Sequence, residues 1–180
     1  DPPEEEEPHV SGSFSLAIED AASMEASAAA LESAGQRAAF FLTGDEIEAF
    51  PELVRSLYAA GHTIGLTVPD GCEDPAAELG SANEALFRVL RRKTLCALLT
   101  AAQTEDCIGY AVFIRPEEQP PLEELLTDGE ETHLLVCADG TAEVLSQLEN
   151  AGATLRLLQE TSPLAHSIAP QEPPENDGLQ

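Results

Sequence analysis

Short apolar runs alternate with helical patterns along the middle of the chain. The first run, FSLAI at 14–18, places Phe14, Leu16 and Ile18 on alternate positions, as expected for a β-strand. Between the runs, apolar residues recur at helical spacing. This alternation predicts an α/β fold with a parallel sheet of about seven strands. The six further runs that predict strands lie at 37–44, 62–68, 94–99, 109–114, 133–138 and 154–159.

Glycine and proline mark the boundaries of the predicted helices. The helical pattern over 23–34 is followed by Gly35, which suits a left-handed cap. Pro51 suits the first turn of a second helix, which is expected to end before Gly61. These signals place helices between consecutive strands, as a parallel sheet requires.

The two ends of the chain differ from its middle. The segments DPPEEEEPH and APQEPPENDGLQ are rich in proline and acidic residues and have too little apolar surface to offset the entropy of ordering them. We therefore expect an acidic flexible linker over 1–12, one folded domain over 13–163 and a flexible tail over 164–180.

Charge excludes several classes of partner. The formal net charge is −26, and the folded middle contributes to it as well as the ends. Nucleic acid and anionic lipid are bound through basic residues, so neither is an expected partner. Four of the eight basic residues lie within RVLRRK at 88–93, where they either complement a helix dipole or form an anion-binding patch. No run approaches the roughly 18 apolar residues of a membrane span, so no membrane insertion is predicted.

The four cysteines lack the CxxC spacing of a zinc knuckle or a thioredoxin-type redox site. Cys96 and Cys137 lie in apolar runs and are expected to be buried thiols, whereas Cys72 and Cys107 lie in loop-like surroundings. Four cysteines allow two disulfides in three pairings, and the sequence leaves both the presence and the pairing of disulfides open.

Candidate chemistry gathers where the predicted strands end, because loops and helix N-termini meet at the carboxyl edge of a parallel sheet. Glu19 next to Asp20 offers a general base and a metal ligand, although both also suit ordinary solvent-facing positions. His62 begins a strand and is expected to be a structural hydrogen-bonding residue. The polar residues predicted at this edge are Glu19, Asp20, Thr43, Asp45, Thr67, Asp70, Arg115, Asp139 and Glu160.

Several phrases resemble the polysaccharide deacetylase family, also called the NodB homology domain. They are SLAIEDA, AAFFLTG, FPELVRSLYAAGHTIG and LLVCADGTAEVLSQLENAGATLRLLQE, and the resemblance spans about 13–162. It implies a distorted (β/α) barrel and the metal-dependent removal of acetyl groups from glycans such as chitin and peptidoglycan. It also implies an extracellular or cell-envelope location in a bacterium.

The resemblance assigns roles to individual positions. Glu19 falls at the position of the catalytic base and Asp20 at that of a metal-binding aspartate. The two metal-binding histidines of the family correspond to Thr67 and Gly71, neither of which carries an imidazole. The family's arginine and proline motif is not recognisable in KTLCALLTAAQ.

The last motif departs from the family pattern as well. Ala138 stands at the position of the family's catalytic histidine, and Asp139 lies beside it. The resemblance therefore predicts a deacetylase-like pseudoenzyme that serves as a structural or binding module of a bacterial envelope or secreted protein. Its expected partners are a glycan or another envelope protein, and no cofactor is expected.

An alternative keeps catalysis. A divergent metal-dependent hydrolase acting on acetylated glycans would use the surviving carboxylates of Glu19, Asp20 and Asp139. An oxygen-rich set of this kind suits a divalent cation such as calcium or magnesium better than zinc. A third interpretation is a glycan-binding groove without chemistry, for which Tyr110, Phe113, Phe50 and Tyr58 are the plausible aromatic contacts.

Overall fold

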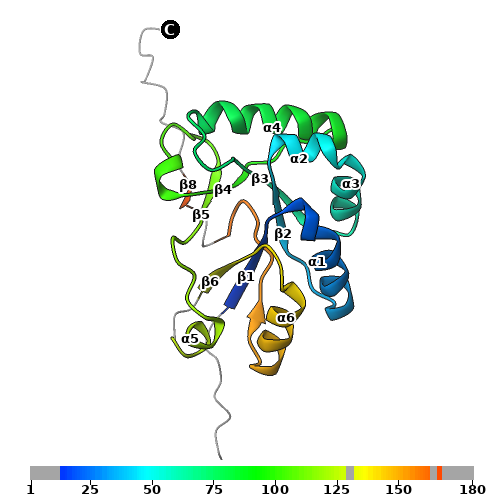
Figure 1. The fold of residues 1–180 in the computed structure, drawn as a ribbon, viewed down its shortest axis with the longest axis vertical. Coiled ribbons are helices and arrows are strands. Elements are labelled where there is room, and N and C mark those ends of the chain that lie inside the picture. Colours follow the sequence, from blue (N-terminus) through cyan, green and yellow to red (C-terminus); the bar gives the residue numbers. More distant parts are fainter. Residues whose placement is uncertain (1–12, 129–131, 163–165, 168–180) are drawn as a thin grey trace, which may run out of the picture.

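In the part of the chain that the structure describes, seven parallel strands form a curled sheet with helices on its outer side (Figure 1). The computed structural model describes residues 13–128, 132–162 and 166–167. The strands are β1 (Ser13–Ile18), β2 (Ala39–Leu42), β3 (Thr63–Thr67), β4 (Cys96–Leu99), β5 (Ala111–Ile114), β6 (Thr132–Cys137), β7 (Thr154–Leu155) and β8 (His166–Ser167). The helices are α1 (Ala21–Ala34), α2 (Gly44–Ala49), α3 (Pro51–Ala59), α4 (Pro75–Leu90), η1 (Ala101–Gln103), α5 (Leu122–Thr127) and α6 (Thr141–Asn150).

The strand order is β6-β1-β2-β3-β4-β5-β8, and β7 pairs with the start of β1. Every pair is parallel except β5 with β8. The predicted α/β fold with about seven parallel strands is confirmed. The carboxyl ends of β1, β3 and β5 therefore lie on one edge of the half-barrel, where a site is expected.

Alternate residues of strands β1 to β6 pack into two separate cores. Phe14, Leu16 and Ile18 pack with helix residues in the outer layer, between sheet and helices. Ala17 and its equivalents on neighbouring strands fill the concave side of the sheet. The residues of this inner core are Ala17, Ala39, Phe41, Cys96, Leu98, Phe113 and Leu158. A strand buried on both faces explains the nearly continuous apolar runs in the sequence.

Gly65 in β3 makes the inner core possible. A Cβ built on Gly65 would lie 2.6 Å from Cδ1 of Phe41, far inside van der Waals contact. The Phe41 ring therefore occupies the space above the glycine and meets Phe113 edge-on, with ring centroids 6.1 Å apart. The second glycine of GHTIG is thus a packing requirement of the scaffold.

The helix boundaries follow the predicted signals. Gly35 caps α1 in a left-handed conformation with φ of 67°. Pro51 is at the first turn of α3. A further short helix, α2, precedes α3. The two helices are separate because Phe50, which lies between them with φ of −127° and ψ of 55°, is not helical. A residue before proline is disfavoured in the helical region.

The last predicted strand, 154–159, is shorter than expected. After Leu155, the Arg156 N–H donates to the Phe14 carbonyl oxygen at 2.7 Å. Leu158 is then fully buried in the inner core, where its carbonyl oxygen accepts from Thr63 Oγ1 at 2.7 Å. The segment closes the amino end of the half-barrel instead of extending β7.

The two predicted terminal segments lie mostly outside the described residues, and their flexibility stays a prediction. Strand β8, at 166–167, falls within the range assigned to the tail and pairs antiparallel with β5. Among the helices that the structure describes, none has the length and apolar character needed to cross a bilayer.

Candidate functional site

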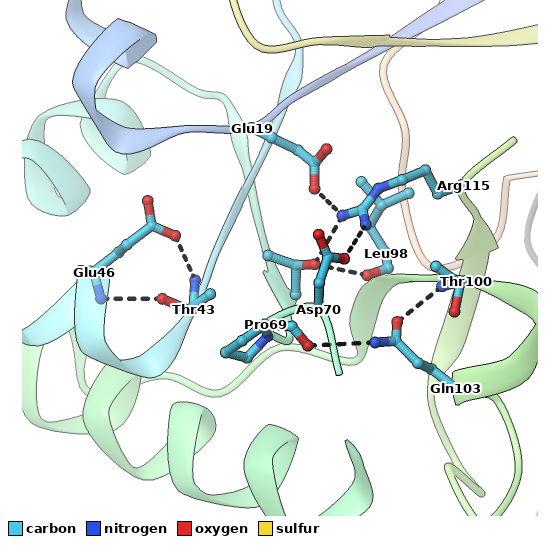
Figure 2. A network of polar contacts seen from close by, with 10 residues as sticks. Glu19, Thr43, Glu46, Pro69, Asp70, Leu98, Thr100, Gln103 and Arg115 are labelled. Carbon is cyan, nitrogen blue, oxygen red and sulfur yellow. Dashed lines mark hydrogen bonds and ion pairs between the residues drawn. The ribbon is translucent and has the colours of Figure 1, made fainter. Parts of the chain in front are cut away.

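The guanidinium of Arg115 lies at the centre of the carboxyl edge of the sheet (Figure 2). Its Nη2 forms an ion pair with Oε1 of Glu19 and donates to Oγ1 of Thr67 at 3.3 Å. Its Nη1 lies 3.7 Å from Oδ1 of Asp70. The ends of β1, β3 and β5, distant in sequence, are thus joined by one side chain.

The backbone sets the position of this arginine. Arg115 directly follows β5, and its N–H donates to the Leu99 carbonyl oxygen at 2.8 Å, which continues the ladder with β4. Thr67 is buried, and its hydroxyl donates to the Leu98 carbonyl oxygen at 2.9 Å. That donation leaves the oxygen of Thr67 free to accept from Arg115.

The Arg115–Glu19 pair is largely removed from solvent, with 23% and 20% of the two side chains exposed. Asp70 is 94% exposed, so its contact with Arg115 is a surface ion pair of small energy. Nε of Arg115 is buried and has no hydrogen-bond partner in the described part of the chain. The strong interaction at this edge is therefore between Arg115 and Glu19.

Asp20 serves helix α1. It has φ of 67°, and its Oδ1 accepts from the Ala22 N–H at 3.2 Å, as an N-cap does. Ser23 in the first turn donates to the Asp20 carbonyl oxygen at 3.0 Å and also to that of Ala138. The turn after β1 is thus tied to the end of β6.

Glu46 is a site residue that was not predicted. Thr43 and Glu46 form a capping box at the start of α2, with distances of 3.0 and 3.2 Å. The other carboxylate oxygen of Glu46 accepts from the Ala21 N–H at 2.9 Å, which joins α2 to the turn after β1. The TGDE sequence at 43–46 carries the capping-box signal and would have identified it.

The donor groups present do not fit a metal ion. Glu19 is engaged by Arg115, Asp20 caps a helix, and Asp139 is exposed without a hydrogen bond or ion pair to the described residues. In the described ranges, no three histidine, cysteine, aspartate or glutamate side chains lie close enough together to hold one. The positions assigned to metal histidines carry the buried hydroxyl of Thr67 and, at Gly71, no side chain.

Glu160 lies away from this edge. Its Oε1 accepts from the Leu95 N–H at 3.4 Å, just before β4 begins, and it borders a hollow lined by Thr63, Thr94 and Cys96 at the starts of β3 and β4. The expectation that Glu160 joins the site was wrong. Because β7 ends at Leu155, the chain that follows it runs along the amino ends of the strands, and Glu160 lies there.

The histidine at the start of β3 has a structural role, as predicted. His62 is buried, and its Nδ1 accepts from the Ala38 N–H at 3.2 Å. Burial, and next the positive charge of Arg37, lowers the pKa of His62 from its ordinary value of 6.5. A neutral imidazole is what this hydrogen bond requires.

A hollow of about 610 Å³ borders the site between the segments 70–75 and 100–106. Asp70 belongs to its lining and also contacts Arg115. The lining residues are Asp70, Gly71, Cys72, Glu73, Asp74, Pro75, Thr100, Ala102, Gln103, Glu105 and Asp106. Among the lining residues that the structure describes, five carry carboxylates and none is basic, so we call this the acidic hollow.

The four aromatic residues considered as glycan contacts differ in their exposure to solvent. Phe113 is fully buried in the inner core, and Tyr110 is partly buried. Phe50 and Tyr58, however, are 48% and 41% exposed.

Comparison with known sequences supports the resemblance inferred from the residues. Residues 10–67 match the sequence model of the family described as Polysaccharide deacetylase. This match runs from the chain before β1 to the end of β3, so it includes Glu19, Asp20 and Thr67. Comparison with curated protein sequences gives no significant match.

Solved structures share the fold. The polysaccharide deacetylase Bc1974 from Bacillus cereus aligns with a TM-score of 0.68 and 14% identity over 86% of this chain and 97% of that one. The peptidoglycan deacetylase PdaC from Bacillus subtilis gives 0.62 and 11% over 82% and 88%. A mutant of BA3943, a CE4 family pseudoenzyme with restored enzymatic activity, gives 0.58 and 15% over 84% and 67%. The predicted (β/α) barrel of the deacetylase type is confirmed.

Proposed function

We propose that this chain is a polysaccharide-deacetylase-like domain without metal-dependent catalysis, and that it serves as a structural or binding module of a bacterial envelope or secreted protein. One observation carries the proposal. The Arg115 guanidinium contacts both Glu19, at the position of the family's base, and Thr67, at the position of a metal-binding histidine. A fixed organic cation thus takes the place of a metal ion among these groups.

Electrostatics explains why the two cations exclude each other. At an effective dielectric constant of about 20, a divalent ion about 4 Å from a guanidinium is repelled by on the order of 8 kcal/mol. A catalytic zinc normally has three protein ligands, and Thr67 and Gly71 supply no imidazole to compensate. Arginine keeps its proton and does not generate the metal-bound water that deacetylation of this type needs.

The comparisons support the scaffold and supply a precedent. BA3943 is a pseudoenzyme on this fold, so loss of activity is compatible with it. The peptidoglycan deacetylase PdaC is another structural relative, which supports an envelope or extracellular setting. We propose a glycan or another envelope protein as the partner. A protein partner is favoured because Phe113 is fully buried and Tyr110 is partly buried, while the exposed Phe50 and Tyr58 do not belong to the lining of the hollow beside Arg115.

Acetate release tests the loss of catalysis. The purified chain is incubated with acetylated chitooligosaccharides or peptidoglycan and with zinc, cobalt or manganese, beside the Glu19→Gln variant. We expect no acetate from either protein. Acetate released by the wild type and lost in Glu19→Gln would refute the proposal and establish the divergent hydrolase instead.

Binding tests the module role separately. Titration with chitooligosaccharides and peptidoglycan fragments is expected to show no saturable binding up to millimolar concentration if the partner is a protein. Saturable binding without acetate release would make the partner a glycan and leave the loss of catalysis intact.

A further inference from the structure

Two segments that carry cysteines are held together beside the Arg115 site. The Pro69 carbonyl oxygen accepts from the Cys72 N–H at 3.2 Å. It also accepts from Nε2 of Gln103 at 3.4 Å (Figure 2). The backbone carbonyl oxygen of Gln103 accepts from Sγ of Cys107 at 3.3 Å. A continuous chain of contacts therefore connects Cys72 to Cys107.

Both side chains pack into the same hydrophobic layer. Cys107 is fully buried in the outer core, and the half-buried Cys72 packs against that core and lines the acidic hollow. Burial raises the pKa of the Cys107 thiol, and the carboxylates of Asp106 and Asp74, followed by an electrostatic interaction with the Cys72 side chain, raise it further. The Cys72 thiol thus lies within electrostatic reach of Cys107.

The remaining cysteines are separated from this pair by the sheet. Cys96 is on β4 in the inner core, on the other side of the sheet. Cys137 belongs to the outer core but is the last residue of β6, at the opposite end of the strand order from β4 and β5. Both are buried, and burial raises the pKa of each thiol to about 11. Neither lines the hollow that Cys72 lines, so neither is placed to exchange with a Cys72 that carries a small thiol.

We propose that Cys72 and Cys107 form a disulfide when the protein meets an exchangeable disulfide such as oxidised glutathione, and that this bond locks the loop 69–74 onto the segment 100–107. The thiolate of the accessible Cys72 attacks one sulfur of the oxidant and expels a thiolate. The Cys107 thiol then loses its proton and attacks Sγ of Cys72, which expels the second thiolate. Two protein thiols are oxidised and one small disulfide is reduced to two thiols.

The bond would stiffen the edge of the site. It closes a covalent ring through α4 and β4, and the loop that it holds carries both Asp70 and Gly71. A disulfide that closes a ring of this size, formed without strain, is expected to raise Tm by about 8 to 15 °C. This inference concerns the loops and does not depend on the proposed loss of catalysis.

The sequence allows a clean assignment of the bond. Cleavage after glutamate places each cysteine on a separate peptide: 53–73 for Cys72, 85–105 for Cys96, 106–117 for Cys107 and 132–143 for Cys137. The native chain is equilibrated with oxidised glutathione, its remaining thiols are alkylated, and the peptides are identified by mass spectrometry. A parallel sample is oxidised in urea.

We expect peptides 53–73 and 106–117 to be cross-linked with the loss of two hydrogens, while Cys96 and Cys137 are alkylated only after unfolding. The urea sample should give mixed pairings instead. The Cys72→Ser variant, altered at a half-buried position, should fold and lose the redox-dependent shift in Tm. A native chain that carries glutathione on Cys72 with Cys107 still free, or that shows the mixed pairings of the urea sample, would overturn the proposal.

Discussion

Replacing Arg115 with methionine tests the interaction that organises the candidate site. The variant keeps the aliphatic bulk of the side chain and removes the guanidinium that contacts Glu19, Thr67 and Asp70. We expect the free energy of unfolding to fall, because the carboxylate of Glu19, 20% exposed, loses its partner while largely withdrawn from water.

The magnitude follows from burial. Exposed ion pairs contribute about 0.2 to 1 kcal/mol, whereas breaking a fully buried pair costs about 3 to 5 kcal/mol. The Arg115–Glu19 pair is mostly but not fully covered, so we expect a loss of about 2 kcal/mol. The contact with Asp70, which is 94% exposed, should contribute less than about 0.5 kcal/mol of this. For a chain of this size, 2 kcal/mol corresponds to a Tm lower by about 4 to 8 °C.

Urea unfolding in a double-mutant cycle separates the pair from other effects of the substitutions. Arg115→Met, Glu19→Gln and the double variant should give a coupling energy of about 1 to 2 kcal/mol. Arg55→Met is the matched control, because Arg55 pairs with Glu52 on the surface of α3 with side chains 48% and 86% exposed. The control should change stability by less than about 0.5 kcal/mol. A coupling energy no larger than experimental error, or a more stable Arg115→Met variant, would refute the reasoning.

Three further predictions concern the scaffold around the site. Asp20→Ala should lower the free energy of unfolding by about 1 to 2 kcal/mol, measured by thermal unfolding, because it removes the cap of α1. Asp20→Asn should lower it by less than about 0.5 kcal/mol, because an amide oxygen also caps a helix. Equal losses in the two variants would argue against a cap. Gly65→Ala should cost about 1 to 3 kcal/mol, since its Cβ collides with the Phe41 ring, and an unchanged Tm would contradict this packing. Because burial lowers the pKa of His62 below 6.5, the unfolded chain binds more protons there. Its contribution to stability is complete above pH 6.5 and lost as the pH falls through the folded pKa, so urea unfolding from about pH 7.5 to 5 should show a smaller decline for His62→Gln than for the wild type. Parallel pH profiles would show that His62 does not titrate in this way.

The scaffold was predictable because its signals are local. Alternating apolar residues located the strands, and Gly35 and Pro51 marked helix boundaries, since each depends on the conformation of a few neighbouring residues. The shortening of β7 was not predictable from TLRLLQ, because it results from contacts of Arg156 and Leu158 with distant strands.

The candidate site was also predictable only in part. Sequence reasoning correctly listed Glu19, Thr67, Asp70 and Arg115 among the residues at strand ends. It did not show that Arg115 would select Glu19, because the two are separated by 96 positions and the choice depends on the curl of the sheet. Asp139 carries a carboxylate, as Glu19 does, and also follows a strand. It nevertheless lies exposed and forms no ion pair with the described residues.

Metal stoichiometry tests the central claim most directly, that Arg115 and not a metal ion is the cation at the carboxyl edge of the sheet. The purified wild type, Thr67→His/Gly71→His and the same double variant with Arg115→Ala are dialysed against zinc and analysed for bound metal. We expect no stoichiometric zinc on the wild type, and tighter binding by the triple variant than by the double variant, because only the triple variant lacks the repelling guanidinium. One zinc per wild-type chain, lost on Asp20→Asn or Glu19→Gln substitution, would contradict the account.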